Sequence, residues 1–252
     1  MSVTSGGPRK FRGEIERPVA GRYHLYVSYA CPWASRAIIV RALKGLEDAI
    51  GMTALDPVKD DDGWAFRPIR GGEEDPVNGF ELLREAYDAT DATYEGRHTI
   101  PVLWDKQTGR IVSNESADIM RMLNCDFEDV ATRDVDLYPE SLRAEIDALS
   151  ERIQRDVAQG VYRAGFATSQ AAYEAAYDRY FAALDFFEDS LGTRRFLCGS
   201  SPTLADWRLF TTLLRHDFVY YGHFKLNERR LVEYEHLWPY VRDLAQQPGI
   251  ME

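Results

Sequence analysis

The fold of this chain is governed by residues 25–40, which read LYVSYACPWASRAIIV. An alternating apolar run typical of a β-strand ends at Cys31, and an apolar run at helical spacing begins after Pro32, which suits the first position of a helix. Cys31 is therefore expected to cap a helix, where unpaired backbone N–H groups and the positive end of the helix dipole favour thiolate over thiol. At such positions the pKa of a cysteine typically falls from about 8.5 toward or below neutrality. The sequence predicts a nucleophilic cysteine, with Arg36 expected to add positive charge nearby.

No second cysteine stands where it could resolve a disulfide made by Cys31. In a Cys-x-x-Cys pair the second thiol lies three residues on, and here that position is Ala34. A disulfide formed by Cys31 must therefore be opened by an external small thiol. The alternative is that Cys31 is a buried apolar residue with no chemistry, because free cysteine is among the most buried residue types.

Composition argues against several classes of function. The 252 residues carry a formal net charge of −11 and no block of Lys or Arg, which disfavours binding to nucleic acids or anionic membranes. No stretch approaches the roughly 18 apolar residues that span a bilayer, and residues 1–8 lack the apolar core of a signal peptide. Cys31, Cys125 and Cys198 are too widely spaced for a disulfide framework or a zinc site. We therefore expect a cytoplasmic protein without a metal.

The first part of the chain predicts a β-α-β unit. Residues 1–20 are polar and are expected to be loosely ordered. Strands are predicted over residues 23–28 and 51–58, with a helix over 32–46 between them. The two strands should be parallel because the helix connects them.

An acidic loop over residues 59–79 follows, and it is too long for a simple connection in a compact domain. It carries Trp64 and Phe66. Two aromatic residues in a long loop either anchor it to the domain or contact a ligand. Anchoring is the more frequent outcome, although such loops also carry function disproportionately.

A short helix over residues 80–89 precedes two strands, 99–105 and 110–113, that should pair as a hairpin. Pro101 cannot donate to a sheet ladder, so it suits an edge or a tight turn, with a peptide bond either cis or trans. In the cis form the backbone of Ile100 would face outward, where it could bind an extended peptide by strand-like hydrogen bonds.

Glu115 and Ser116 open the next helix, which continues through residues 119–123. The first N–H groups of that helix would suit a carboxylate, although plain helix capping is by itself the simpler explanation. The order strand, helix, strand, helix, hairpin, helix is the thioredoxin-type layout. It brings Cys31, the Ile100–Pro101 pair and the Glu115–Ser116 pair to one edge of the sheet.

Strand signals end there, and the remainder of the sequence predicts helices only. Apolar residues recur at helical spacing, and Thr203–Asp206 is a capping box at the start of a helix. We therefore divide the chain into an α/β domain, residues 1–124, and an all-α domain, residues 125–252. The aromatic residues of the helical domain are mainly core, but Tyr162 and Tyr220 fall at helix ends, where hydroxyls can reach a cleft.

Together these motifs resemble the glutathione transferase fold, a thioredoxin-like domain followed by a helical domain. More narrowly, the chain resembles the glutathionyl-hydroquinone reductases, also called the Xi class. The matching segments span nearly the whole chain from residue 22 to 249 and are 23–28, 30–34, 63–66, 96–106, 111–116, 160–170, 205–210 and 223–225. Cys-Pro-x-Ala alone would also suit the Omega class, whereas the full set is highly specific.

The resemblance implies an enzyme in which Cys31 attacks the sulfur of a glutathionyl-hydroquinone, releases the hydroquinone and retains glutathione as a mixed disulfide. A second glutathione then resolves that disulfide to oxidised glutathione, which agrees with the absence of a resolving cysteine. Glutathione is thus the co-substrate, and no metal is involved. The family is also similar in forming homodimers, contacted largely through the helical domain.

By position, the resemblance also implies the residues that contact each part of the substrate. Trp64 would pack on glutathione, and the Ile100 backbone, next to Pro101, would bond its cysteinyl part. Glu115 and Ser116 would hold its γ-glutamyl end. Candidates for the hydroquinone side are Trp33, Tyr162 and Tyr220.

Three departures from the family pattern bear on the expected site. Ser35 stands where the family usually has His, which would alter the charge near the thiolate. No tryptophan precedes the first strand. The family usually continues past the turn at residues 246–249 with adjacent tyrosines near the quinone pocket, whereas this sequence ends at Glu252. A more open acceptor pocket is therefore expected.

Two other functions stay open at this point. One is a glutathione lyase or broader thiol transferase that acts on another aromatic thioether. The other is a non-catalytic ligand-binding protein on the transferase fold. Poor turnover of hydroquinone conjugates would favour the first, and glutathione affinity without thiol transfer would favour the second.

Overall fold

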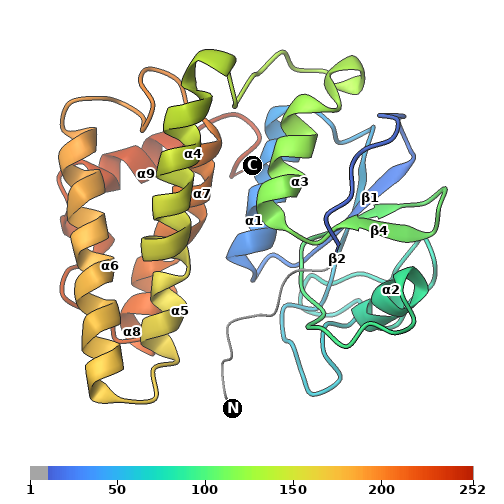
Figure 1. Ribbon diagram of the computed structural model, residues 1–252, viewed down its shortest axis with the longest axis horizontal. Helices are drawn as coiled ribbons and strands as arrows, with labels where there is room; N and C mark the ends of the chain where they lie inside the picture. The colour runs from blue at the N-terminus through green and yellow to red at the C-terminus, as the bar shows by residue number, and fades with distance from the viewer. Residues whose placement is uncertain (1–10, 252) are drawn as a thin grey trace. The chain divides into compact units, whose positions relative to one another are not determined.

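The computed structural model describes residues 11–251, and the chain falls into two units, one ending at Val135 and the other beginning at Asp136. The first unit is a sheet covered by helices, and the second is built from helices (Figure 1). This confirms the expected fold class. Loose order is expected for residues 1–20, but residues 1–10 lie outside the described part of the chain.

Four strands form the sheet of the first unit in the order β2-β1-β3-β4. β1 (Tyr23–Val27) and β2 (Gly51–Ala54) are parallel, whereas β3 (Val102–Asp105) runs antiparallel to β1 and to β4 (Arg110–Ser113). The predicted β-α-β unit and hairpin are therefore confirmed. β2 is shorter than the strand predicted over 51–58, because the chain leaves the sheet after Ala54 to begin the acidic loop.

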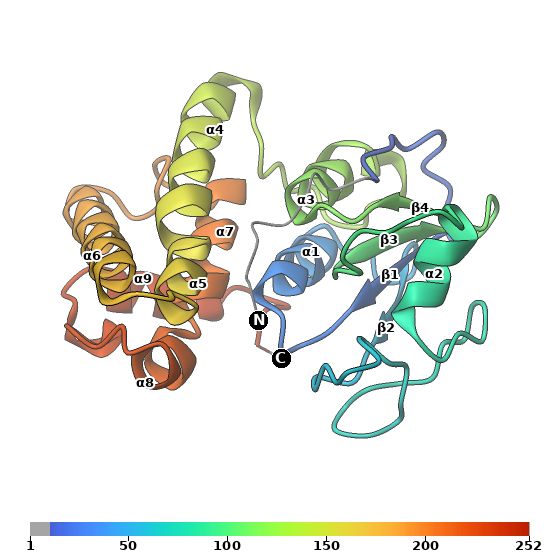
Figure 2. The same cartoon turned by 60° about the horizontal axis from the view of Figure 1, so that its bottom comes forward.

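Three helices cover the two faces of this sheet (Figure 2). α1 (Pro32–Leu43) and α3 (Ser116–Cys125) pack against each other on one face, and α2 (Leu83–Thr90) packs against β4 on the other. α1 ends earlier than predicted because Gly45 takes a left-handed conformation, with φ of 63°. Glycine adopts that conformation at little steric cost, and it ends the helical hydrogen-bond pattern.

A group of buried apolar residues, here called the N-terminal core, fills the space between α2, the acidic loop and the sheet. Its members are Tyr26, Leu55, Phe66, Leu83, Ala86, Tyr87, Ile100, Val102, Trp104 and Ile111. Cys31 and Trp64 are partly buried and pack against this core from outside. The core thus touches three of the segments that the sequence predicts for the site.

Residues 11–13 are bound to the sheet, so the loose order expected for this part of the N-terminal segment is wrong. The Gly13 N–H donates to the Val112 carbonyl oxygen at 2.8 Å, and the Phe11 carbonyl accepts from the Asn114 N–H at 3.3 Å. β4 is an edge strand, and an edge offers unpaired N–H and C=O groups to any adjacent extended segment. The Phe11 ring also packs 5.7 Å from the ring of Tyr87.

Residues that follow α3 stay with the first unit up to Val135, which is beyond the boundary expected after residue 124. The Thr132 hydroxyl donates to the Gly45 carbonyl at 2.9 Å, and the Lys44 ammonium group donates to the Val135 carbonyl at 2.8 Å. These bonds hold the acidic segment after α3 against the end of α1.

The second unit begins with a nearly continuous rod made of α4 (Arg143–Arg152), a π-helix η3 (Ile153–Ala158) and α5 (Gly160–Gly165). α6 (Gln170–Leu191) lies beside this rod (Figure 1). The π-helices η3 and η4 (His216–Tyr220) were not predicted, because their wider turn has no signature in the apolar spacing.

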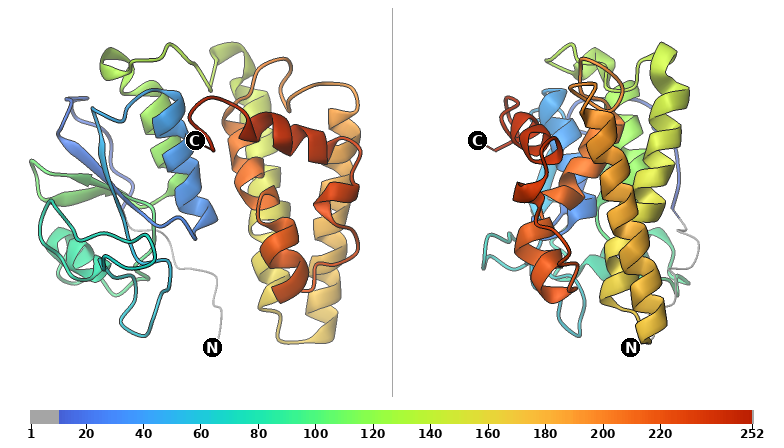
Figure 3. Two further views of the ribbon diagram at one scale, coloured as in Figure 1. Left: turned by 180° about the vertical axis from the view of Figure 1, so that it is seen from behind. Right: turned by 90° about the vertical axis from the view of Figure 1, so that its left-hand side faces the viewer.

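The remaining helices of the second unit complete its core (Figure 3). α7 (Leu204–Leu213) packs on α4 and η3, and α9 (Leu237–Ala245) packs on α6 and α7. The second π-helix, η4 (His216–Tyr220), and the single turn α8 (Tyr221–His223) join them. The all-helical character predicted for the second half is therefore confirmed.

The predicted capping box at the start of α7 is present. The Asp206 carboxylate accepts from the Thr203 N–H at 2.7 Å and from the Thr203 hydroxyl at 2.9 Å. Its other oxygen accepts from the Leu197 N–H at 2.8 Å and from the Tyr240 hydroxyl at 3.0 Å. A fully buried carboxylate is costly unless its lone pairs are satisfied, and these four bonds meet that need.

Candidate active site

Cys31 lies where the sequence predicts it, at the N-cap of α1. Its backbone is extended, with φ −90° and ψ 117°, and Pro32 occupies the first turn of the helix. The side chain is half-buried, so the thiol is not sealed from solvent. The Ser35 N–H and hydroxyl both donate to the Cys31 carbonyl oxygen, at 3.0 and 3.1 Å. The first turn of α1 thus holds the backbone of Cys31 in place.

The structure brings Cys31 next to the predicted proline turn. Its Sγ–H donates to the Ile100 carbonyl oxygen at a sulfur–oxygen distance of 3.9 Å. The Ile100–Pro101 peptide bond is cis, and both side chains are buried. Residues 69 positions apart in the sequence therefore share one edge of the sheet.

Glu115 and Ser116 begin α3, as predicted. Glu115 is the N-cap, and its carboxylate accepts from the Ala117 N–H at 3.3 Å, so the capping explanation holds for this residue. Ser116 is 1% exposed, and within residues 11–251 its hydroxyl has no hydrogen-bond partner. A buried hydroxyl at a helix N-terminus is a donor suited to a carboxylate.

A hydrogen-bond network that the sequence did not reveal connects the proline turn to the start of α3. The Tyr87 hydroxyl donates to the Thr99 carbonyl at 2.7 Å and accepts from the Thr99 N–H at 2.9 Å. It also accepts from the Asn114 side-chain amide at 3.0 Å, and the same amide donates to the Thr99 hydroxyl at 3.2 Å. Burial raises the pKa of the Tyr87 hydroxyl, which keeps it neutral and able to donate.

The acidic loop is anchored by one of its aromatic residues and presents the other. Phe66 is buried, with its ring 5.1 Å from that of Tyr26, whereas Trp64 is only half-buried against the N-terminal core. The Trp64 carbonyl accepts from the Leu83 N–H at 2.9 Å, which ties this part of the loop to the start of α2. Anchoring, the more frequent role, therefore falls to Phe66 and leaves part of the Trp64 ring exposed.

Trp33, the candidate from α1, is half-buried and is the second residue of the helix. The Arg36 guanidinium lies 4.4 Å from the centre of its ring, a cation–π distance. Arg36 itself is 1% exposed. The structure thus places positive charge on the first turns of α1, as the sequence predicts.

In the second unit, Tyr162 and Tyr220 lie together. Their ring centres are 6.4 Å apart, edge to face, and Phe166 and Phe224 complete a group that we call the aromatic cluster. Phe224 lies 5.9 Å from Tyr162 and 5.6 Å from Tyr220. Tyr220 is the last residue of η4, and π-helical turns are frequently found at functional sites.

Gly165 allows this cluster to form, and its role was missed in the sequence. A Cβ at this position would lie 2.3 Å from Cγ of Phe224, closer than carbon atoms can approach. Only glycine lets the Phe224 ring pack against the end of α5. A hollow of about 380 Å³ opens beside these two residues and is also lined by Tyr173, His223 and Lys225.

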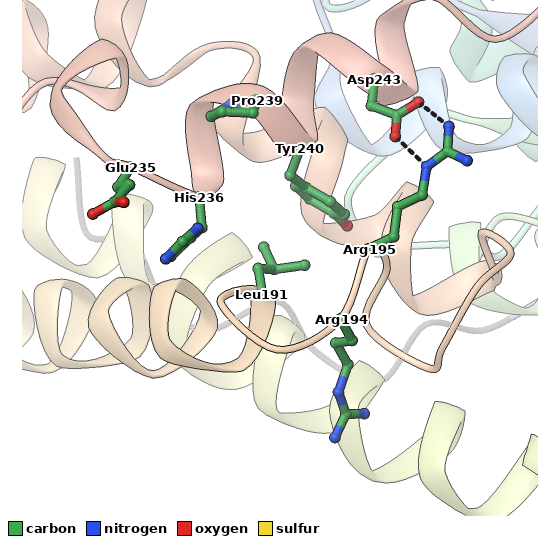
Figure 4. A pocket seen from close by; sticks show the side chains of 8 residues that line it. All are labelled: Leu191, Arg194, Arg195, Glu235, His236, Pro239, Tyr240 and Asp243. Atoms are coloured by element: carbon green, nitrogen blue, oxygen red, sulfur yellow. Dashed lines mark hydrogen bonds and ion pairs between the residues drawn. The ribbon is translucent and has the colours of Figure 1, made fainter.

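Another hollow, of about 220 Å³, lies on the helical unit beside α9 and is lined by Leu191, Arg194, Arg195, Glu235, His236, Pro239, Tyr240 and Asp243 (Figure 4). Its two guanidinium groups are already engaged. Arg195 makes two bonds to Asp243, at 2.7 and 3.0 Å, and Arg194 binds Glu145 and the Leu197 carbonyl. This hollow therefore lacks the unengaged positive charge that an anionic substrate would need.

None of the three cysteines, which all lie within residues 11–251, forms a disulfide. Cys198 is buried, and burial raises the pKa of its thiol to about 11. In the described part of the chain no group of three or more His, Cys, Asp and Glu side chains is arranged to hold a metal ion. Over the same residues, every helix is too short or too polar to cross a membrane.

Two family models match the chain. "Glutathione S-transferase, N-terminal domain" covers residues 30–125, and "Glutathione S-transferase, C-terminal domain" covers residues 170–243. These matches agree with the sheet-and-helix unit that carries Cys31 and with the helical unit that follows. The fold and the site at the start of α1 therefore define a glutathione transferase.

Relatives and solved structures narrow the class. The chain is 47% identical to glutathionyl-hydroquinone reductase PcpF of Sphingobium chlorophenolicum over 93% of its own length and 74% of the relative's. It is also 47% identical to glutathionyl-hydroquinone reductase YqjG of Escherichia coli, over 92% of this chain and 71% of that relative. The Xi-class transferase of Natrialba magadii superposes with a TM-score of 0.94 at 45% identity, covering 96% of this chain and 76% of that one. The chain belongs to the Xi-class glutathione transferase family.

A further solved structure bears on the ligand. The glutathione-bound structure of YqjG superposes with a TM-score of 0.91 at 45% identity, covering 93% of this chain and 77% of that one. The bound glutathione is an observation made on YqjG.

Proposed function

We propose that this protein is a glutathione-dependent reductase that cleaves glutathionyl-hydroquinones to hydroquinone and oxidised glutathione. The observation that carries the proposal is the position of Cys31, half-buried at the N-cap of α1 and next to the Ile100 carbonyl, with Ala34 in place of a resolving cysteine. The two relatives named glutathionyl-hydroquinone reductases, at 47% identity, support this substrate class.

The proposed reaction has two thiol steps. The Cys31 thiolate attacks the sulfur of the conjugate, an S–S bond forms, and the bond between sulfur and the ring carbon breaks. The ring carbon takes the electron pair and a proton and leaves as hydroquinone. The thiolate of a second glutathione then attacks the mixed disulfide, releases oxidised glutathione and returns Cys31 as a thiolate. Because the second thiol is external, the reaction needs glutathione as co-substrate.

Five residues of the first unit are proposed to hold the glutathionyl group. The Ile100 backbone, in the cis turn before Pro101, bonds the cysteinyl part as an added strand would. The buried Ser116 hydroxyl and the first N–H groups of α3 donate to the γ-glutamyl carboxylate, with Glu115 opposite its amino group. The exposed part of the Trp64 ring packs on the peptide. The Ser116 hydroxyl, which is buried and has no hydrogen-bond partner within residues 11–251, is the observation that most favours this arrangement.

Three aromatic residues are proposed for the hydroquinone side, namely Trp33, Tyr162 and Tyr220. Tyr162 and Tyr220 are in contact, and a phenol hydroxyl can donate to a quinone oxygen while its ring stacks on an aromatic substrate. Trp33 stands two residues after the nucleophile.

The test uses a synthetic glutathionyl-hydroquinone with the purified protein. We expect release of hydroquinone and oxidised glutathione, and mass spectrometry should detect a glutathione adduct on Cys31 when the second glutathione is withheld. Cys31→Ser should lose turnover while retaining glutathione affinity, because the nucleophile is removed and the binding surface is not. Turnover of Cys31→Ser at the wild-type rate would refute the mechanism. Faster turnover of another glutathionylated aromatic would reassign the substrate, and binding without thiol transfer would reduce the protein to a ligand carrier.

We further propose that the protein is a cytoplasmic homodimer. Three cysteines without a disulfide among the described residues suit a reducing compartment. Phe218, on η4 of the helical unit, is 86% exposed, and association through this side of the unit would remove its apolar ring from water. Sedimentation should give a dimer, and Phe218→Glu should shift it toward the monomer. A wild-type monomer would contradict the proposal.

A further inference from the structure

We infer that Tyr87 is a positioning residue for glutathione, because its hydroxyl holds together the segments that carry the proposed glutathione contacts. This inference rests on the proposed function for the identity of the bound peptide. Tyr87 lies on α2, on the face of the sheet opposite α1, and it is not itself among the predicted site residues.

The Tyr87 hydroxyl has its full set of hydrogen bonds, all within the first unit. It donates to the Thr99 carbonyl at 2.7 Å and accepts from the Thr99 N–H at 2.9 Å and from the Asn114 amide at 3.0 Å. One hydroxyl offers one donor and two acceptor positions, and these bonds occupy them. A fourth neighbour, the Thr99 hydroxyl, lies 3.2 Å from the same oxygen. Tyr87 is fully buried, so water does not compete for these bonds.

Each bond partner stands next to a proposed glutathione contact. Thr99 immediately precedes Ile100, whose backbone faces the cysteinyl part. Asn114 immediately precedes Glu115, the N-cap of α3. The Thr99 carbonyl and N–H belong to the main chain, so these two bonds set the backbone of the turn. The Thr99 hydroxyl also lies 3.2 Å from the phenol oxygen.

The third binding segment is tied to the helix that carries Tyr87. Trp64 accepts from the N–H of Leu83, the first residue of α2, at 2.9 Å, and Ala65 forms a bridge with Leu82. α2 therefore connects the Trp64 loop, through Tyr87, to both of the other segments.

The position of the ring is fixed by its neighbours. Phe11, Tyr94 and His98 lie around it, with ring centres 5.7, 5.0 and 5.0 Å away. Tyr87→Phe would keep this packing and remove only the hydroxyl. The Thr99 N–H and carbonyl and the Asn114 amide would then be unsatisfied or would have to move, and either outcome disturbs the two segments they precede.

The test compares Tyr87→Phe with Tyr94→Phe in the full-length protein. Tyr94 belongs to the same ring packing, but its hydroxyl donates to the Arg97 carbonyl at 3.0 Å, so this control loses a phenol hydroxyl without touching Thr99 or Asn114. The probe is S-methylglutathione, which cannot form a disulfide, with Kd measured by titration calorimetry. KM and kcat for a glutathionyl-hydroquinone are measured alongside.

For Tyr87→Phe we expect Kd for S-methylglutathione and KM for the conjugate to rise together by about five- to twentyfold, with kcat at saturation within about twofold of wild type. Tyr94→Phe should leave all three unchanged. Asn114→Ala should raise Kd by a smaller factor, and combining it with Tyr87→Phe should add little, because both act through one network. Asn114→Ala also decides the question should Tyr87→Phe fail to fold.

An unchanged Kd in folded Tyr87→Phe or Asn114→Ala would overturn the inference. So would equal effects in Tyr87→Phe and Tyr94→Phe, which would assign only structural roles to both hydroxyls. A wild-type protein that binds S-methylglutathione without reducing the conjugate would refute the proposed reaction alone, and the ratio of Kd values would still decide the role of Tyr87. A wild-type protein that does not bind the probe would overturn both.

Discussion

At the scale of single residues, the three cysteines differ in ways that their identity does not reveal. Cys31 is half-buried at a helix N-cap, whereas Cys198 is buried and burial raises the pKa of its thiol to about 11. Alkylation requires the thiolate, so surroundings decide which cysteine reacts. We expect iodoacetamide at pH 7 to label Cys31 rapidly and to spare Cys198. Peptide mass spectrometry would measure this, and rapid label at Cys198 would contradict it; Cys31→Ser serves as the control.

Gly165 gives a second test at this scale. Gly165→Ala would bring a Cβ to 2.3 Å from the Phe224 ring, so that ring must shift and disturb its contacts with Tyr162 and Tyr220. Overpacking of this kind costs about 1–3 kcal/mol of unfolding free energy. We also expect a higher KM for the aromatic conjugate. Thermal unfolding and kinetics would measure both changes.

The matched control for that variant is Gly222→Ala. Gly222 lies in α8, and a Cβ there would meet nothing within 4 Å, so the substitution should be neutral or slightly stabilising. Similar losses in both variants would mean that the packing against Phe224 is not the cause.

At the scale of elements, the start of α7 can be tested through its cap. Thr203→Ala removes the hydroxyl that donates to Asp206 at 2.9 Å and should lower the unfolding free energy by about 0.5–2 kcal/mol. Thr203→Ser keeps the hydroxyl and should restore most of this loss. Chemical denaturation measures the difference, and equal stability of the two variants would contradict the role of the cap.

The same scale shows what the sequence could and could not predict. The strands, α1 and α3 follow from periodicity and capping residues, which are local signals, and so do the positions of Cys31 and Glu115. The position of Phe11–Gly13 has no such signal, because it depends on hydrogen bonds with Val112 and Asn114, which lie about 100 residues later in the sequence. The Tyr87 bonds were missed for the same reason. Side-chain hydrogen bonds between residues 12 and 27 positions apart leave no periodic trace.

At the scale of the whole molecule, each unit contains a buried histidine that makes stability depend on pH. His24 lies on β1 with its Nε2 2.7 Å from the Thr53 hydroxyl, and burial lowers the pKa of its ring to about 4. His216, in the second unit, lies between the Tyr180 hydroxyl and the Arg229 carbonyl, and burial lowers its pKa as well. Both rings are therefore neutral in the folded protein above pH 6.5.

The sign of the effect follows from where protons bind. An unfolded histidine takes up a proton near pH 6.5, whereas folded His24 does so only near pH 4, so the unfolded chain binds more protons in between. Unfolding free energy should therefore fall as the pH drops from 6.5 to 4. The slope is at most about 1.4 kcal/mol per pH unit for each histidine, and it vanishes above about pH 7.5, where the unfolded histidines are neutral too. Burial raises the pKa of Asp206, which opposes the trend, so the histidine effect has to be isolated by difference.

The variant His24→Asn isolates the contribution of His24 to the pH dependence of the unfolding free energy. Asn cannot take up a proton, so the difference in unfolding free energy between wild type and variant should shrink steadily as the pH falls from 6.5 to 4.5. Above about pH 7.5 the difference should be constant, because His24 is then neutral in both the folded and the unfolded chain. Urea denaturation at several pH values would measure it. A difference independent of pH across the whole range would mean that folded His24 takes up its proton as readily as the unfolded chain does, against the burial of its ring between β2 and the Tyr26 side chain.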